Sequence, residues 1–451
     1  MSKNRWEELL CSQRLGLRIE DLDFRTEFQR DYDRVIFSSS FRRLQDKTQV
    51  FPLARNDYVR TRLTHSLEVS CVGRSMGMFI GPHLCAKWNL NPITTYSIAD
   101  IIAAACVAHD IGNPPFGHSG EDSIRTWFSR SENSQYLQGL STMQQAEFLS
   151  FEGNAQGFRI LTKLQRHRKS DEETGGLQLT MATLGASLKY PRRALLSKQD
   201  KKRVSQKKFQ FCESEESAFL QVVKTLGLKE TLKGEAWSRH PLVYLVEAAD
   251  DVSYTIADFQ DGFRLGHVSW DVIFSYFERI LGVGSNSALK ESLRMREAKD
   301  RVEYLGGKVI GHLVKEICST FLENEEKILE GSFDQPLISQ IDSKGVLQEM
   351  MDFAHREIYS APEVINIKVA GFEAIQGLLD AFVPAICLDK NGSERERFAL
   401  FKQLIPRQFL EEEEQSEPRT YQQLQQVTDY ISGMTDSYAI SLFRRLKGIE
   451  I

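Results

Sequence analysis

The segment SIADIIAAACVAHDIGNPP (residues 97–115) determines which fold class this chain can adopt. Ten of the twelve residues 97–108 are apolar, but a bilayer span needs about 20 such residues. A helix that is apolar on all sides belongs in a protein core. The apolar run ends in His109 and Asp110, and the glycine and two prolines that follow stop the helix. The segment therefore predicts a buried helix over residues 97–110 that ends in two polar side chains.

Helical patterns continue on both sides of this segment. Residues 62–81 predict a helix before it, and residues 120–129 predict one after it, opened by Ser119 and Asp122 as a variant of the capping box. Strand-like alternation is rare. The remaining helical stretches are residues 150–165, 240–262, 268–330, 344–385 and 420–448. The sequence thus predicts an all-α fold.

The distribution of charge divides the chain into segments. Residues 189–208 contain nine Lys and Arg residues and a single acid, Asp200, which is typical of an insertion on the surface. We therefore expect a helical core in two parts, residues 1–165 and 237–390, interrupted by a helical or loop insertion at 166–236. Residues 391–451 are expected to form a C-terminal helical segment. An exposed break at Glu411–Glu414 and Pro418 should separate its last helical stretch from the rest of the segment.

Composition excludes several classes of protein. The chain has 451 residues, of which 41% are hydrophobic and 26% charged, so it can bury a large core. Its net charge of −5 argues against a constitutively basic nucleic-acid coat. Seven cysteines without a CxxC pair indicate a reducing compartment. The first 16 residues lack the apolar region of a signal peptide. We expect a cytoplasmic protein that does not associate with membranes.

Histidines and aspartates in unusual settings suggest a metal site. His65 lies in a predicted helix, His109 and Asp110 end another, and Asp250 lies within the otherwise apolar helix LVYLVEAADDVSYTIA. Imidazoles with carboxylates suit Mn²⁺, Fe²⁺, Co²⁺ or Mg²⁺ better than a structural zinc ion. Each of these residues alone is more often structural than metal-binding. The residues themselves leave two interpretations open, a mononuclear metal hydrolase and an ordinary helical core.

Longer motifs resemble one family, the HD-domain deoxyguanosinetriphosphate triphosphohydrolases, also called dGTPases. These motifs run in order along nearly the whole chain. They are DYDRVIFSSSFRRLQDKTQVF (31–51), RTRLTHSLEVSCVGR (60–74), AHDIGNPPFGHSGE (108–121), FEGNAQGFRIL (151–161), LTMATLGASLKYP (179–191), HPLVYLVEAADDVSYTIADFQDG (240–262) and TDYISGMTDSYA (428–439). The resemblance implies the all-helical HD-domain fold. It also implies hydrolysis of a deoxynucleoside triphosphate (dNTP) to a deoxynucleoside and inorganic tripolyphosphate.

The resemblance assigns roles to individual residues. It implies a divalent metal ion held by four ligands, His65, His109, Asp110 and Asp250, with Asp251 beside them. His118 resembles the family's acid–base group, oriented by Glu121. A histidine–carboxylate pair suits proton transfer near neutral pH.

Seven further residues are implied to bind the substrate. Arg62 lies three residues before His65 and so on nearly the same helical face, where it can reach a phosphate oxygen. The resemblance implies that the others contact the triphosphate or the deoxyribose. Those for the triphosphate are Lys189, Tyr190 and Lys208; those for the sugar are Tyr254, Asp258 and, as a weaker candidate, Gln45. A tyrosine ring packed under C2′ would exclude a 2′-hydroxyl.

Two alternatives to a dNTP triphosphohydrolase remain at this stage. One is another HD phosphohydrolase, such as a nucleoside monophosphate phosphatase, which would not need the triphosphate contacts. The other is a regulatory or nucleic-acid-binding protein on an HD scaffold, suggested by the basic residues 189–208. The family also implies a homo-oligomer, with hexamers among its assemblies. Single-stranded DNA is a further candidate partner. The sequence does not specify the preferred base or metal, or whether a nucleotide activates the protein.

Overall fold

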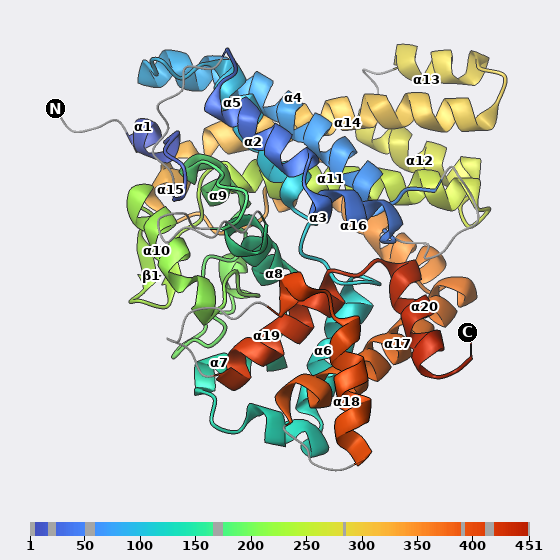
Figure 1. The fold of residues 1–451 in the computed structure, drawn as a ribbon. Coiled ribbons are helices and arrows are strands. Elements are labelled where there is room, and N and C mark those ends of the chain that lie inside the picture. Colours follow the sequence, from blue (N-terminus) through green and yellow to red (C-terminus); the bar gives the residue numbers. More distant parts are fainter. Residues whose placement is uncertain are drawn as a thin grey trace.

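A computed structural model describes residues 5–16, 24–49, 59–165, 175–282, 286–388, 393–410 and 419–449 (Figure 1). In these residues strands are confined to one antiparallel pair, β1 (Glu230–Leu232) and β2 (Ala236–Trp237). The predicted all-α class is confirmed.

The helices before the strand pair are α1 (Arg5–Leu9), α2 (Glu27–Ile36), α3 (Ser39–Arg43), α4 (Arg62–Trp88), α5 (Thr95–Ala108), α6 (His118–Ser129), α7 (Thr142–Leu149), α8 (Gly153–Arg159), α9 (Met181–Ser187) and α10 (Glu216–Thr225). After the pair come α11 (Val243–Arg264), α12 (Trp270–Leu281), α13 (Asn286–Arg294), α14 (Ala298–Glu323), α15 (Glu325–Glu330), α16 (Lys344–Phe353), α17 (Pro362–Cys387), α18 (Ser393–Leu404), α19 (Arg419–Ser432) and α20 (Asp436–Leu446).

The apolar helix α5 lies at the centre of the larger hydrophobic core. It packs against α2, α4, α9 and α11, and all its residues from Ile98 to Ala108 are buried except Asp100. The contact with α4 is close because α4 presents small residues to it. A Cβ atom on Gly77 would lie 2.5 Å from the Cα atom of Ala99. This packing fixes the end of α5, where His109 and Asp110 follow.

Several predicted helix boundaries were wrong. The helix predicted over residues 97–110 is α5, Thr95–Ala108, so His109 and Asp110 follow the helix and are not part of it. The helix predicted over residues 62–81 continues to Trp88, because Gly81 provides close contact with Thr95 of α5 and does not end the helix. The helix predicted from residue 120 with a Ser119 cap begins at His118 instead. Its N-cap is Gly117, with φ 55°, and no side chain caps it.

A second hydrophobic cluster joins the C-terminal helices to α6. Helix α17 packs against α6, α18, α19 and α20. In Figure 1 these helices form the part of the molecule farthest from α5. Among the described helices, α17 is long and apolar enough to cross a membrane, although 56% of its most apolar window is buried within the protein. The C-terminal segment therefore contacts α6, whose first residue is His118.

The part of the predicted insertion that the structure describes, residues 175–236, contributes to the main core. Leu184 of α9 and Phe219 of α10 are completely buried in the same cluster as α5. Residues 166–174 and the predicted break at Glu411–Pro418 lie outside the described residues. The four segment boundaries stay predictions.

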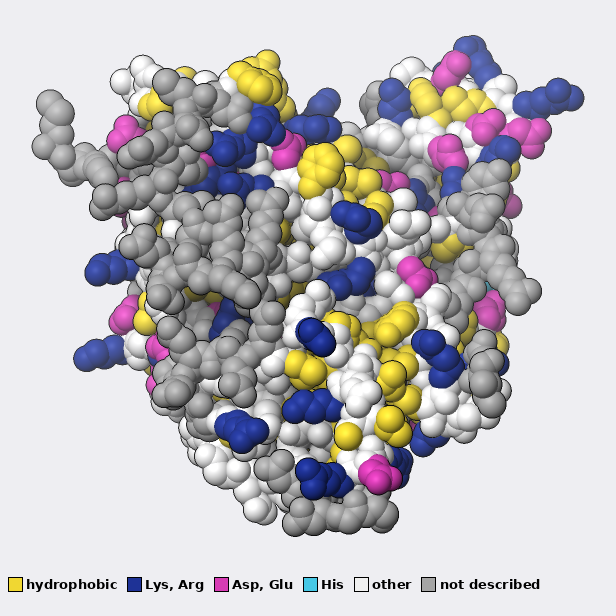
Figure 2. All heavy atoms as spheres, viewed as in Figure 1, with side chains coloured by type: hydrophobic (Ala, Val, Ile, Leu, Met, Phe, Trp, Pro, Cys, Tyr) yellow, Lys and Arg dark blue, Asp and Glu magenta, His cyan; other side chains and the backbone are white. Residues whose placement is uncertain are grey.

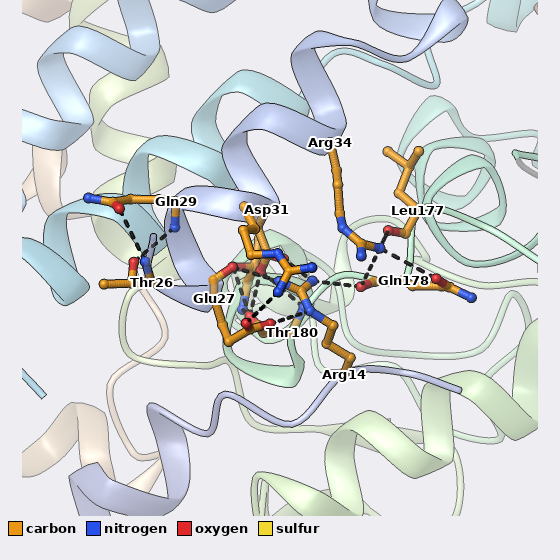
Figure 3. Close-up of polar contacts among 11 residues, drawn as sticks. Arg14, Thr26, Glu27, Gln29, Asp31, Arg34, Leu177, Gln178 and Thr180 are labelled. Carbon is orange, nitrogen blue, oxygen red and sulfur yellow. Dashed lines mark hydrogen bonds and ion pairs between the residues drawn. The ribbon is translucent and has the colours of Figure 1, made fainter. Parts of the chain in front are cut away.

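A buried aspartate connects α2 to the start of α9. Asp31 accepts hydrogen bonds from the amide and the hydroxyl of Thr180, at 3.0 and 2.6 Å, and pairs with Arg14 (Figure 3). The carboxylate of Asp31 is completely buried. It thus fixes the first turn of α9 through charge-assisted hydrogen bonds.

Folding stability should depend on His240, which is fully buried before α11. Its Nε2–H donates to the carbonyl of Leu9 (2.9 Å), and its Nδ1 accepts from the amide of Leu242 (3.2 Å). This arrangement needs a neutral ring, and burial lowers the pKa of His240 from 6.5 to about 4. As pH falls below 6.5 the unfolded chain gains a proton that the folded protein cannot accept, so folding stability is lost.

We expect protonation of His240 in the unfolded chain to lower the free energy of unfolding by at most about 2 kcal/mol between pH 6.5 and 5. His240→Asn should be less stable at pH 7 but lose less stability over that interval. Urea unfolding of both proteins across the pH range measures the difference. Equal slopes would show that His240 is protonated in the folded protein.

Candidate active site

A cavity of about 690 Å³ lies between α4, α5, α6, α9 and α11. Most of the residues predicted to form the site line it. They are Arg62, His109, Asp110, His118, Lys189, Tyr190, Lys208, Asp250 and Tyr254. His65 lies behind this lining, in contact with it, and Glu121 reaches it through His118. Gln45 and Asp258 do not line the cavity.

Three side chains of the predicted metal site lie close together at the cavity. The candidate ligand atoms of His65, His109 and Asp250 all lie within 4.8 Å of one another. Nε2 of His65 is 3.0 Å from Oδ1 of Asp250, and Nε2 of His109 is 3.4 Å from the same oxygen. Three helices supply them, since His65 is on α4, His109 follows α5, and Asp250 is on α11. One ion at this point would therefore join three helices.

The surroundings of this cluster fit a divalent metal ion. Nδ1 of His109 donates to the carbonyl of Cys106 (2.7 Å), so Nε2 is the nitrogen that faces Asp250 and would bind an ion in place of its proton. A ligating histidine commonly makes such a bond with its other nitrogen. Burial alone would lower the pKa of His109, but the carboxylates of Asp110 and Asp250 raise it to about 9. The cluster thus attracts positive charge, and its donors suit a borderline divalent ion.

Asp110 lies beside this cluster but is engaged elsewhere. Its Oδ2 accepts a hydrogen bond from Nη1 of Arg62 (2.7 Å), and its Oδ1 accepts one from the side-chain amide of Asn113. Oδ1 is 3.5 Å from Nε2 of His109. The structure thus brings together three of the four predicted ligands and places the fourth at hydrogen-bond distance from two other side chains. The role of Asp110 as a ligand stays a prediction.

His118 and Glu121 form the pair that the sequence predicted. Nδ1 of His118 is 2.8 Å from Oε2 of Glu121, and Oε1 of Glu121 accepts from the amide of Gly153 (2.6 Å). The imidazole is 82% exposed, whereas the carboxylate is only 2% exposed. Burial would raise the pKa of Glu121, but the bond from His118 and the charge of Lys208 outweigh burial and lower it. A buried, ionised glutamate therefore orients an imidazole that faces the cavity.

The predicted cationic residues Lys189 and Lys208 also line the cavity, each beside a buried carboxylate. Nζ of Lys189 is 3.5 Å from Glu247, and Nζ of Lys208 is 3.0 Å from Glu152. Burial would lower the pKa of Lys189, but the carboxylate of Glu247 outweighs it and raises the pKa above its usual value. Lys189 is therefore charged at neutral pH. Its ammonium group also lies 5.9 Å from the ring centre of Tyr190.

Tyr254 lines the cavity as predicted, whereas Asp258 contacts another residue. The ring of Tyr254 lies edge-on to His65, with ring centres 6.4 Å apart. Asp258 is buried, and its carboxylate accepts a short hydrogen bond from the hydroxyl of Tyr359. Tyr359 lines the cavity and lies 6.1 Å from Tyr254, ring centre to ring centre. Asp258 therefore binds a residue that lines the cavity, and its contact with the sugar stays a prediction.

Gln45 was expected at the sugar, but the structure places it on the surface. It lies in the short 3₁₀ helix η1 (Leu44–Asp46) and is exposed. Gln49, four residues later, lines the cavity instead, and its Oε1 is buried without a hydrogen-bond partner. A buried polar atom without a partner calls for an explanation, and contact with a ligand is one such explanation. Both glutamines belong to one motif, so only the turn after η1 distinguishes them.

Four further residues line the cavity although no sequence pattern indicated them. They come from the region around α16 and α17, and they are Met351, His355, Tyr359 and Lys368. His355 and Tyr359 follow α16 around the π-helical turn η8 (Ala354–Ile358). The amphipathic pattern of residues 344–385 predicted these helices but gave no sign of a functional face. These residues add a thioether, an imidazole, a phenol and an ammonium group to the lining of the cavity.

Comparisons with known proteins agree with this geometry. The HD domain profile matches residues 62–195, and the phosphohydrolase-associated domain profile matches residues 342–445. A deoxyguanosinetriphosphate triphosphohydrolase-like protein of Synechocystis is 41% identical over 99% of this chain and 100% of its own. A protein of the same description from Pseudomonas aeruginosa is 36% identical over 98% of each chain. The deoxyguanosinetriphosphate triphosphohydrolase of Salmonella arizonae is 31% identical over 94% of each chain.

Proposed function

The chain belongs to the HD-domain deoxyguanosinetriphosphate triphosphohydrolase family, and from this we propose that it hydrolyses dNTPs to deoxynucleoside and inorganic tripolyphosphate. Among the four dNTPs, dGTP is our first candidate. One observation carries the proposal. A single cavity has the His65–His109–Asp250 cluster and the His118–Glu121 pair along its walls, together with lysines suited to a triphosphate.

The triphosphate would lie against the cationic side chains. Lys189, Lys208 and Arg62 all line the cavity, and Arg62 pairs with Asp110 beside the three-residue cluster. Each is paired with a carboxylate of the protein, so its position is defined before the substrate arrives. Charge-assisted hydrogen bonds from such groups can neutralise the several negative charges of a triphosphate.

The reaction needs a proton acceptor and a proton donor at the α-phosphorus. His118 would take a proton from the attacking water or give one to the 5′-oxygen as that oxygen leaves. Glu121 would orient the ring and stabilise its charged form. A divalent ion held by the His65–His109–Asp250 cluster, with Asp110 as the fourth predicted ligand, would supply Lewis-acid polarisation and a more acidic water.

Aromatic rings and Gln49 would contact the deoxyribose. Tyr254 and Tyr359 lie beside each other on one side of the cavity. The free oxygen of Gln49 suits a sugar hydroxyl as hydrogen-bond donor. A ring packed on C2′ leaves a ribonucleotide's 2′-hydroxyl buried without a partner.

Sugar selectivity should depend on Tyr254. An unpaired buried hydroxyl costs about 1–3 kcal/mol, so we expect dGTP to be preferred over GTP by about one to two decades in kcat/KM. Tyr254→Ala should narrow that gap and also lower turnover of dGTP through lost packing. Measuring kcat/KM for both nucleotides with both proteins tests this. An unchanged ratio would mean that other residues read the sugar.

The decisive assay uses the purified chain with each dNTP and NTP, in Mn²⁺ or Mg²⁺. Nucleoside, phosphate and tripolyphosphate are then separated and quantified. We expect deoxynucleoside and tripolyphosphate in equal amounts. Free phosphate in place of tripolyphosphate would instead support the second candidate, another HD phosphohydrolase.

The expected partners stay predictions. A homo-oligomer, a cytoplasmic location and binding of single-stranded DNA were all inferred from the sequence. Figure 2 shows Lys and Arg side chains spread over one face, with hydrophobic side chains between them over the C-terminal helices. Leu400 and Leu404 of α18 and Tyr438 of α20 are among the exposed hydrophobic residues. Sizing with and without an oligodeoxynucleotide tests both assembly and DNA binding.

A further inference from the structure

The motif TDYISGMTDSYA (428–439) contributes no residue to the lining of the cavity, yet it contacts two of its walls. Asp436 begins α20 and is 1% exposed. Its Oδ1 accepts a hydrogen bond from the amide of Phe116 (2.9 Å). Its Oδ2 accepts two from Thr48, from the amide (3.0 Å) and the hydroxyl (2.6 Å). One carboxylate therefore binds two segments that are far apart in sequence.

The first of these segments determines where His118 lies. Phe116 and Gly117 both have positive φ angles, 62° and 55°, immediately before His118 begins α6. A non-glycine residue adopts this conformation only at an energetic cost. The ring of Phe116 packs against Gly371 of α17, where a Cβ atom would lie 2.4 Å from the ring. The C-terminal helices thus stabilise a costly turn through both the backbone and the side chain of Phe116.

The second segment carries Gln49, which also lines the cavity. Thr48, the residue before it, is bound to Asp436 through both backbone and side chain. Lys47 adds a parallel connection, because its buried Nζ donates to the carbonyls of Asn113 and Ser432. The loop before His118 and the segment before Gln49 are therefore connected to each other through residues 432–436.

We infer that Asp436 is a positioning residue for the active site, which fixes the turn before His118 relative to the segment that carries Gln49. It touches neither the cavity nor the predicted metal ligands. Its effect on the reaction rests on the proposed function, since it acts through His118. Its effect on the loop does not depend on the proposed function and can be measured without any substrate.

Hydrogen exchange followed by mass spectrometry tests the effect on the loop. In Asp436→Asn, whose amide cannot accept from all three donors, exchange in residues 111–118 and 45–49 should be about 10-fold faster, as expected when hydrogen bonds to a charged acceptor are lost. Asp31→Asn is the matched control, because Asp31 accepts from Thr180 at the same two lengths and contacts no residue that lines the cavity. Its faster exchange should be confined to the region around Thr180. Unchanged exchange at 111–118 in Asp436→Asn would overturn the inference.

Kinetics in two backgrounds test the effect on the reaction. We expect Asp436→Asn to lower kcat by about 10–100-fold, the scale for a catalytic group displaced by roughly 1 Å. Added to His118→Ala, the same substitution should change the residual kcat little, because the group it positions is absent. An equal loss in both backgrounds would show a general structural role and contradict the inference. A wild-type protein without dNTP hydrolysis would refute the proposed function, while the exchange experiment would still decide whether Asp436 fixes the loop.

A milder pair of variants tests the inference if the two aspartate variants fail to fold. Thr48→Val removes one donor from Asp436, and Thr180→Val removes one from Asp31. Both should fold, and Thr180→Val should show at least as large a decrease in Tm, because the hydroxyl of Thr180 also caps α9. Only Thr48→Val should lower kcat, and equal kcat values in the two variants would contradict the inference.

Discussion

His65→Ala should lose its metal and its activity together. His65 is fully buried, and its Nε2 lies 3.0 Å from Asp250 in the centre of the three-residue cluster. Removing it leaves two of the three closely placed donors, and Lewis-acid stabilisation worth several kcal/mol is lost with the ion. At 1.36 kcal/mol per decade, we expect turnover to fall by at least about 10³-fold. Elemental analysis of the purified variant and a dNTP assay of the same sample measure both effects.

The control is His240→Asn, which also removes a fully buried imidazole but does so outside the cavity. It should be destabilised and yet keep its metal and most of its turnover at neutral pH. Full metal occupancy in His65→Ala would refute the ligand assignment. Loss of metal in both variants would show only that folding had failed.

His118→Ala should have the second-largest effect on turnover, but this variant, unlike His65→Ala, should keep its metal. Its imidazole is 82% exposed and contacts Glu121, not the predicted ligands. The variant should therefore keep its metal and bind dNTP while turnover falls by about 10²–10⁴-fold, the usual contribution of one general acid–base group. Single-turnover rates and metal content in the same preparation measure this.

His312→Ala provides a matched comparison for the acid–base prediction. His312 on α14 also pairs with a glutamate, Glu316 at 3.0 Å, but neither residue lines the cavity. This variant should have wild-type turnover. If His118→Ala also turns over at the wild-type rate, His118 takes no part in the proton transfer.

The parts of the fold and site that the sequence predicted share one property, which is that they depend on short-range patterns. The apolar run before His109 requires a buried helix wherever the rest of the chain lies. The apolar residues around Asp250 do the same for α11. Because both helices had to be buried, the polar residues that they carry had to meet a partner. The all-α class follows from this, whereas the meeting of His65, His109 and Asp250 was expected only from the resemblance of the longer motifs to a family.

The parts that the sequence failed to predict depend on turns and distant contacts. Gln49, not Gln45, reaches the cavity because of the backbone turn after η1. Helix α6 starts at His118 because Phe116 and Gly117 adopt positive φ angles. Asp258 binds Tyr359, a residue 101 positions later, and no local pattern reveals such a contact. The resemblance to a family identified the right motifs but could not decide which side chain in each motif faces the substrate.

The bonds between Thr48 and Asp436 also have a consequence for the time course of synthesis. These residues are 388 positions apart, and a ribosome that adds about 5–20 residues per second needs roughly 20–80 s to cover that distance. During this interval the loop before His118 has emerged without the carboxylate that fixes it. A nascent or truncated chain would contain all the residues that line the cavity and still lack their final arrangement. Activity should therefore begin only after translation has delivered the last helix, and a messenger cut short near its end should yield a protein that can bind nucleotide but hydrolyses it slowly.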